Sequence, residues 1–219
     1  MEQMNFIQTL AVWALPVLFA ITVHEVAHGW VAQRLGDPTA MMLGRLTLNP
    51  VKHVDLLGTV IVPILLLYMG GFVFGWAKPV PVTWENLKQP KRDMVLVAAG
   101  PLATQIRAFL WAIVMKIGLM MATTYPDMQG FFLALFYMGG AGLTIHIVLM
   151  VLNLLPVPPL DGSRVVTGFL SDRAAWQYNR IEPYGLLVIL VLLGTGALGY
   201  ILVPPVQLLR TFMFTMFGL

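Results

Sequence analysis

The sequence predicts an all-α polytopic membrane protein with five or six membrane helices and a re-entrant or hairpin segment after the first of them. Of its 219 residues, 58% are hydrophobic and only 11% are charged, whereas about a quarter of the residues in soluble proteins are charged. Several apolar stretches reach the roughly 20 residues that a helix needs to cross a bilayer. Because little polar sequence separates these stretches, we expect residues 1–219 to form a single domain of a multi-pass cell-membrane protein.

The first half of the chain is predicted to hold one long helix and one irregular apolar segment. The helix extends from about Phe6 to Leu35 and ends at Gly36-Asp37-Pro38, a combination that stops helices and starts turns. Residues Gly44 to Asn49 alternate between apolar and polar, as a strand or hairpin does. The apolar run from Leu56 to Trp76 contains residues that bend or break helices, namely Pro63 and Gly70-Gly71.

The second half is predicted to contribute the remaining spans. A basic loop leads into a long apolar segment from about Met94 to Met121, which includes Gly100-Pro101. The next span extends from about Phe131 to Leu155, and the last starts near Pro183 and reaches about Val203. The tail beyond Pro204-Pro205 is short for a full crossing, so we expect it to lie at the interface or to form a tilted sixth helix.

The first predicted helix carries a metal-binding pattern. His24-Glu25-Val26-Ala27-His28 matches H-E-x-x-H, in which two imidazoles one turn apart share Zn²⁺ and the glutamate takes a proton from water on the metal. A catalytic zinc ion usually has three protein ligands and keeps a fourth position for water. Because the chain has no Cys, the missing ligand is expected to be a His or a carboxylate.

Asp161 is the carboxylate that best suits this third position. It follows an apolar run and the stretch Pro156-Val157-Pro158-Pro159, whose prolines remove backbone donors and hold the chain extended at a fixed depth. An ionisable group at membrane depth is costly unless it is paired or coordinated. The positions of His24, Glu25, His28 and Asp161 therefore call for a functional explanation.

These polar residues also admit other interpretations. H-E-x-x-H also arises by chance on the solvated surface of soluble helices, but three adjacent polar side chains inside an apolar helix do not fit that origin. His53 lies in a loop, where a local hydrogen bond is the simpler interpretation. His146 lies within a span, where a hydrogen bond to a neighbouring helix is the simpler interpretation. The many Met and aromatic residues are expected to serve packing and lipid contact.

Three motifs together resemble the site-2 protease family of intramembrane zinc metalloproteases. They are H-E-V-A-H at 24–28, A-G-P-L at 99–102 and N-L-L-P-V-P-P-L-D-G at 153–162. Residues 44–49 and 75–82 are similar to the compact prokaryotic branch, which lacks PDZ and CBS domains. The resemblance implies one zinc ion per chain with His24, His28 and Asp161 as ligands, Glu25 as the catalytic base and acid, and Asn153 as a catalytic polar group that helps to hold the substrate or the tetrahedral oxyanion.

Two positions depart from the family's pattern. Family members often have Asn where this chain has Thr104 and His146. Neither position is a predicted ligand, so the departures bear on substrate or structural roles of those asparagines and not on the metal chemistry.

The side on which the active site opens is predicted from parity and charge. Asp161 and the two histidines meet only if an even number of crossings separates them, which requires the 56–76 run to bend and return. Irregular backbone is tolerable at membrane depth where it lines a buried cavity. The positive-inside rule then directs the active-site mouth toward the cytoplasm, because this arrangement places ten of the thirteen Lys and Arg residues on one face. The ten are Arg34, Arg45, Lys52, Lys78, Lys88, Lys91, Arg92, Arg164, Arg173 and Arg180.

The resemblance implies a zinc endopeptidase that hydrolyses peptide bonds in or near transmembrane helices, as in regulated intramembrane proteolysis. Its expected partners are a transmembrane protein substrate and the lipid bilayer. The net charge of +3 gives no indication of nucleic acid, and a homo-oligomer is left open. The main alternative is an ion- or proton-coupled transporter that uses the buried His, Glu and Asp residues. A noncatalytic scaffold and a di-iron desaturase are weaker alternatives, the latter because four histidines are too few for its His-rich site.

Overall fold

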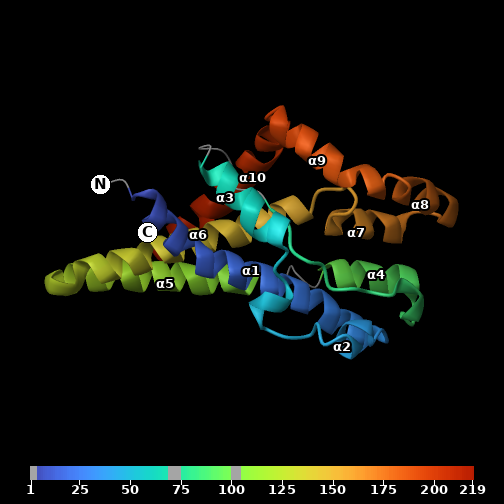
Figure 1. Cartoon of the computed structure of the whole chain (residues 1–219), viewed down its shortest axis with the longest axis horizontal. Helices are drawn as coiled ribbons and strands as arrows, with labels where there is room; N and C mark the ends of the chain where they lie inside the picture. Colours follow the sequence, from blue (N-terminus) through green and yellow to red (C-terminus); the bar gives the residue numbers. More distant parts are fainter. Residues whose placement is uncertain (1–3, 69–74, 100–104) are drawn as a thin grey trace.

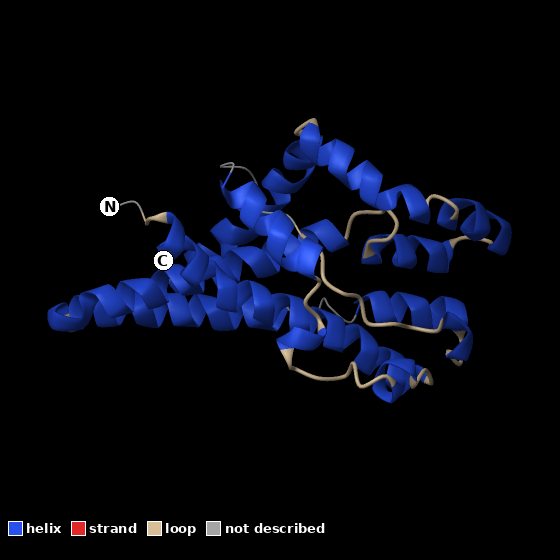
Figure 2. Cartoon of the chain, in the orientation of Figure 1, coloured by secondary structure: helices blue, strands red, loops and turns tan. Residues whose placement is uncertain are grey.

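The computed structural model describes residues 4–68, 75–99 and 105–219, and within these ranges it contains helices and loops but no strand (Figure 2). The all-α prediction is therefore confirmed for the described part of the chain. Three long helices define the main axis of the molecule (Figure 1): α1 (Phe6–Leu35), α5 (Gln105–Thr124) and α6 (Gln129–Asn153). The shorter helices α2 (Thr39–Met42), α4 (Pro90–Ala99), α7 (Asp161–Phe169) and α8 (Asp172–Asn179) gather at one end.

Helix α1 has the bounds that the sequence predicts. Asn5 caps its first turn, since the Asn5 side chain accepts a hydrogen bond from the Gln8 amide and the Gln8 side chain accepts one from the Asn5 amide. At the other end Gly36 has φ of +116°, a left-handed conformation in which glycine has no steric penalty. These two caps place the His24 and His28 turn in the second half of a continuous helix.

Helices α5 and α6 form an antiparallel hairpin at the centre of the packing. A Cβ atom on Gly142 would lie 2.2 Å from the Trp111 ring, and one on Gly139 would lie 2.5 Å from the backbone nitrogen of Met115. Glycine at these positions lets the two helices approach closely, as small residues do in membrane proteins. Helix α6 also contacts α1 and α10 (Ala197–Phe217), so it holds together elements from both halves of the sequence.

Asp37 fixes the chain as it leaves α1. The buried carboxylate accepts hydrogen bonds from the Thr83 amide at 2.7 Å, from the Asn86 side chain at 3.0 Å and from both the amide and the hydroxyl of Thr39. Burial opposes ionisation, but these hydrogen bonds outweigh it and lower the pKa of Asp37. The carboxylate thereby connects the end of α1 to the segment that leads into α4.

The strand predicted at Gly44 to Asn49 is wrong. These residues form a loop that side chains hold in place: the His53 ring is bonded to the Thr47 carbonyl at 2.8 Å, and Arg45 donates to the Lys78 carbonyl at 2.9 Å. The alternation of apolar and polar residues produces no ladder because no described segment pairs with this one along its backbone.

The apolar run from Leu56 to Trp76 does not form one straight helix. A π-helical turn at Leu56–Ile61 continues into α3 (Val62–Tyr68), and the predicted bend at Gly70-Gly71 lies outside the described residues. The Trp76 amide donates to the Gly58 carbonyl at 3.0 Å, and the Thr59 hydroxyl donates to the Trp76 carbonyl at 2.8 Å. The two ends of the run therefore lie side by side.

Two predicted spans have different bounds in the structure. The segment from Met94 to Met121 is divided between α4, which ends at Ala99, and α5, which begins at Gln105; Gly100-Pro101 lies between them, outside the described residues. The span from Pro183 to Val203 is divided at Gly196 (φ +76°) into α9 (Gly185–Gly194) and α10. The sequence prediction places the end of the last span at Val203 because Pro204-Pro205 suggests a helix end. Membrane helices nevertheless tolerate proline where neighbouring groups satisfy the freed backbone groups.

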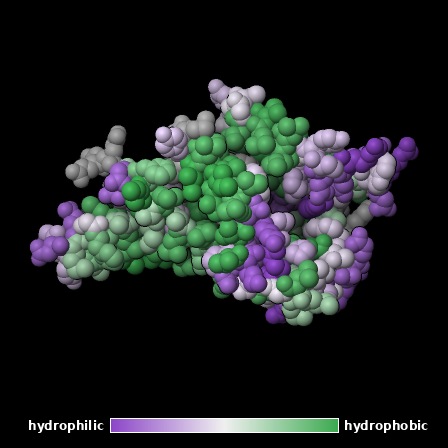
Figure 3. Space-filling view, viewed as in Figure 1, coloured by the Kyte–Doolittle hydropathy of each residue, from purple (hydrophilic) through white to green (hydrophobic). Residues whose placement is uncertain are grey.

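Within the described residues, four helical segments are long and apolar enough to cross a membrane. They lie at Phe6–Leu35, Ile106–Thr124, Pro126–Asn153 and Ala197–Phe217. Figure 3 shows hydrophobic surface over the middle of the molecule and hydrophilic surface at the end that carries α7 and α8. The chain is therefore built as a membrane protein, while the count of five or six spans and the single domain stay predictions.

Candidate functional site

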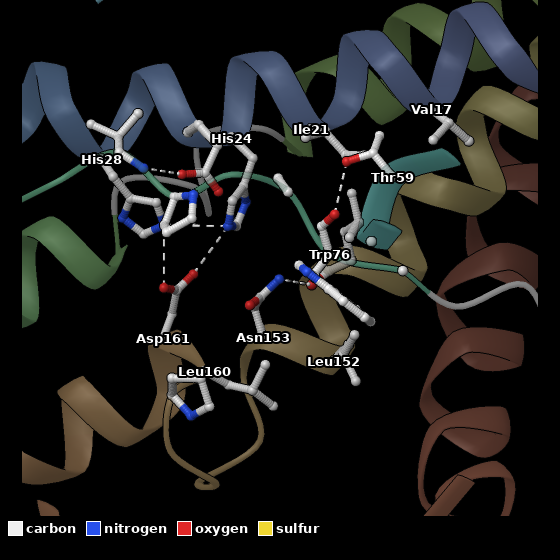
Figure 4. A pocket seen from close by; sticks show the side chains of 18 of the residues that line it. Val17, Ile21, His24, His28, Thr59, Trp76, Leu152, Asn153, Leu160 and Asp161 are labelled. Carbon is white, nitrogen blue, oxygen red and sulfur yellow. Dashed lines mark hydrogen bonds and ion pairs between the residues drawn. The ribbon is translucent and has the colours of Figure 1, made fainter. Parts of the chain in front are cut away.

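The residues of the predicted metal site converge from two distant parts of the sequence. His24 and His28 project from one face of α1, and Asp161 is the first residue of α7 (Figure 4). Asp161 Oδ2 lies 3.3 Å from His24 Nε2, and Asp161 Oδ1 lies 3.2 Å from His28 Nε2. One possible ligand atom from each residue lies within 4.8 Å of the others, and among the described residues this is the only such group of three.

The donor atoms of this group suit a cation. His28 Nδ1 lies 2.9 Å from the Val97 carbonyl, and because a carbonyl only accepts, Nδ1 carries a proton, so that Nε2 of the neutral imidazole presents a lone pair. That lone pair faces the Asp161 carboxylate and also His24 Nε2, which is 3.2 Å away. Acceptor atoms that point at one another repel unless a cation lies among them. Two imidazoles and one carboxylate are the ligand set of many catalytic zinc sites.

The position of Asp161 is fixed by a tightly packed connection between α6 and α7. A Cβ atom on Gly162 would lie 2.4 Å from the Leu154 carbonyl oxygen, and one on Gly185 would lie 1.6 Å from the Pro158 carbonyl oxygen. Burial raises the pKa of Asp161, but when the His24 and His28 imidazoles are protonated, their hydrogen bonds and positive charge outweigh burial and hold that pKa below its usual range. The Asp161 carboxylate therefore gains from positive charge at this position, whether from an imidazolium or from a metal ion.

Glu25 is held beside this group by the segment 75–82. The Val80 amide donates to Glu25 Oε2 at 2.7 Å. Gly29 permits the approach, since a Cβ atom there would lie 2.9 Å from Val80 Cγ1. The other carboxylate oxygen, Oε1, accepts no hydrogen bond from the described residues, and Glu25 faces the same cavity as His24 and His28. The geometry thus leaves one oxygen of Glu25 available to a reacting group.

These residues lie in a cavity of about 770 Å³. Along α1 its lining extends from Leu10 to His28, which is about five helical turns. Most of the lining is apolar and comes from α1, α3, α6 and α9, whereas its charged side chains gather near the metal-binding group. The histidines and Asp161 therefore open onto a cavity whose lining is mainly apolar.

The structure places the remaining predicted residues as follows. Asn153 lines the cavity at the end of α6, and its side-chain amide donates to the Leu149 carbonyl at 2.9 Å. The His146 Nδ1 atom is bonded to the Gly142 carbonyl at 2.7 Å within the same helix, and its Nε2 atom has no partner among the described residues, so they provide no bond across helices. His53 is bonded locally, as predicted. Thr104 and the A-G-P-L motif after Ala99 lie outside the described residues.

Sequence reasoning missed the backbone groups that orient the site. The Val97 carbonyl positions His28 and the Val80 amide positions Glu25, but a backbone group leaves no signature in residue type. The P-V-P pattern at 79–81 was a usable signal, because prolines on both sides leave Val80 as the one amide donor of that stretch.

Comparison with known proteins identifies relatives over most of the chain. The sequence is 38% identical, over 87% of this chain and 83% of the relative, to YwhC of Bacillus subtilis (strain 168), which is named as a candidate zinc metalloprotease. It is 30% identical, over 88% of this chain and 69% of the relative, to Rip2 of Mycolicibacterium smegmatis, whose name describes the same activity. No protein-family model and no solved structure matches the chain. The extent of these two matches shows that the chain belongs to the zinc metalloprotease family of YwhC and Rip2.

Proposed function

We propose that this metalloprotease is an intramembrane zinc endopeptidase of the site-2 protease type, which hydrolyses peptide bonds in or near transmembrane helices of membrane proteins. The observation that carries the proposal is the position of the His24, His28 and Asp161 group in an apolar cavity between helices long enough to span a bilayer. A zinc protease that acts on soluble proteins has no need of such a cavity. The same proposal includes one zinc ion per chain and regulated intramembrane proteolysis as the process served.

The roles of the residues follow from where their polar atoms lie. His24, His28 and Asp161 would hold the zinc ion, which when bound polarises a substrate carbonyl and makes water nucleophilic at neutral pH. Glu25 takes a proton from the attacking water on its free oxygen and delivers it to the leaving nitrogen. Asn153, whose amide lines the same cavity, provides a hydrogen bond to the substrate backbone or to the oxyanion.

The proposed topology is a folded-back segment at 56–76 with the active site open toward the cytoplasm. The contact between Gly58 and Trp76 supports the fold-back, because the two ends of a segment that crossed the membrane would be far apart. The hydrophilic end near α7 and α8 carries Arg164, Arg173 and Arg180, and an excess of Lys and Arg favours the cytoplasmic side.

The test of this function is hydrolysis of a peptide that spans a vesicle membrane. We expect the purified protein to cut such a peptide, to lose the activity when a chelator removes the metal, and to regain it with zinc. The transporter alternative, which the metalloprotease names of the relatives do not favour, predicts ion or proton flux across the vesicles. Flux without any peptide cleavage would overturn the proposal.

The Val80 amide offers a prediction about how Glu25 is positioned. Val80→Pro removes the only donor to Glu25 Oε2 that the described structure shows, while an extended segment between two prolines accommodates a third. We expect kcat for the membrane peptide to fall about tenfold to hundredfold, with zinc content unchanged. Val80→Ala, which shortens the side chain but keeps the amide, is the matched control. A Val80→Pro protein with normal kcat would show that this hydrogen bond is not needed.

A further inference from the structure

A charged contact lies at the hydrophilic end of the cavity and has no part in the chemistry above. Arg164 of α7 forms an ion pair with Glu182, and its guanidinium carbon lies 5.5 Å from the centre of the Trp84 ring. All three side chains line the cavity. We call these three residues the Arg164 bridge.

The Arg164 bridge connects elements on both sides of the cavity. Trp84 begins the turn that leads into α4, and Glu182 begins the turn that leads into α9. Helix α7 lies between α4 and α9 in Figure 1, so a side chain from α7 reaches toward both. Arg164 follows Asp161 by three residues on the same helix and therefore projects from a similar face. The bridge thus lies next to the metal-binding group, at its hydrophilic side.

Arg164 is the more buried member of this contact and has two partners. The Arg164 side chain is 17% exposed, whereas the Glu182 side chain is 37% exposed. An arginine that is both paired with a carboxylate and stacked on an aromatic ring is held in one position, because its planar guanidinium makes both contacts at once. A fixed side chain of this size takes up room in the cavity lining, three residues along α7 from Asp161.

We propose that the Arg164 bridge closes the hydrophilic end of the cavity to polypeptides dissolved in water, and so makes the enzyme select substrates that enter from the membrane. This inference rests on the proposed function, since it assigns the residues that set the substrate class of the same site. From the other direction the α1 lining is apolar from Leu10 to Ile21, about three turns, which suits a segment that arrives from lipid. Water and small ions still pass a rim made of side chains.

The first test compares two substrates that contain the same cleaved sequence, one a membrane-spanning peptide in vesicles and the other a short soluble peptide. For Arg164→Ala we expect kcat/KM for the soluble peptide to rise about tenfold, the shift that loss of one ion pair and one cation–π contact can produce. The value for the membrane peptide should stay within about twofold. Glu182→Gln, which keeps the side-chain size, should change the ratio in the same direction.

Arg180→Ala is the matched control, because Arg180 also stacks on a tryptophan, 5.0 Å from the Trp176 ring centre, but does not line the cavity. It should change neither rate. An unchanged ratio of the two kcat/KM values in both bridge variants would overturn the proposal. So would an equal rise for both substrates, which indicates a general change in the site.

A second test does not depend on activity. The chain has no Cys, so Val148→Cys places a single thiol in the cavity lining on α6. A bulky water-soluble maleimide should label this thiol about tenfold faster when Arg164→Ala is added, and equal labelling rates would overturn the bridge as a barrier. If no form of the protein cleaves either peptide, the proposed protease function fails, while the labelling rate still decides whether the bridge closes the cavity.

Discussion

Glu25→Gln is expected to abolish hydrolysis of a membrane peptide while the protein keeps its zinc. The glutamine oxygen can still accept the hydrogen bond that the Val80 amide gives to Glu25, so the local geometry is retained. The amide cannot take a proton from water, and loss of a general base typically lowers kcat by about 10²- to 10⁴-fold. Turnover of the membrane peptide and zinc per chain are measured on the same preparation.

Val80→Ala serves as the control for Glu25→Gln. Val80→Ala keeps the carboxylate and should cut the peptide, which shows that small changes around Glu25 are tolerated. If Glu25→Gln also lost its zinc, Glu25 would be a ligand or a structural group and its assignment as the base would be wrong. Full activity in Glu25→Gln would remove Glu25 from the mechanism altogether.

Asp161→Ala is expected to weaken zinc binding by about hundredfold or more. Loss of a group that only hydrogen-bonds to a metal ligand already lowers metal affinity about tenfold to hundredfold, and a direct ligand contributes more. The substitution leaves His24 and His28 as the only ligands of the group, and hydrolysis should be lost with the metal. Zinc retained during dialysis against chelators of graded strength measures the change.

The matched control for this substitution is Asp172→Ala. Asp172 is likewise the first residue of a short helix at the same end of the molecule, but it does not line the cavity. It should bind zinc as tightly as the unaltered protein. Equal zinc affinity in Asp161→Ala and Asp172→Ala would show that the third ligand is another residue.

The sequence predicts local features of this protein well. The limits of α1 depend on caps within a few residues of each end, Asn5 with Gln8 and Gly36, and the spacing of His24 and His28 is a property of one helical turn. Asp161 can also be predicted from the sequence, although it lies more than 130 residues after the histidines, because the prolines before it single out one carboxylate at the end of an apolar run. The structure brings it beside the histidines; its role as a ligand stays a proposal.

The errors arose where distant partners decide the conformation. Residues 44–49 have the alternation of a strand, but side-chain bonds from Arg45 and to Thr47 hold them as a loop. The end of α9 depends on Gly196 in a left-handed conformation, which a nearby Pro-Pro pair concealed. The Arg164 bridge is not predictable from the sequence, in which Arg164 is only a positive charge near the membrane, because the sequence does not show that Trp84 and Glu182 lie beside it.

The most direct measurement of the central claim is X-ray absorption at the zinc edge of the purified protein. We expect one zinc ion with two imidazole nitrogens and oxygen ligands at about 2.0–2.2 Å, and a zinc signal per chain that falls sharply in Asp161→Ala. A zinc ion without histidine ligands, or an undiminished zinc signal in Asp161→Ala, would contradict the convergence of α1 and α7 on one metal.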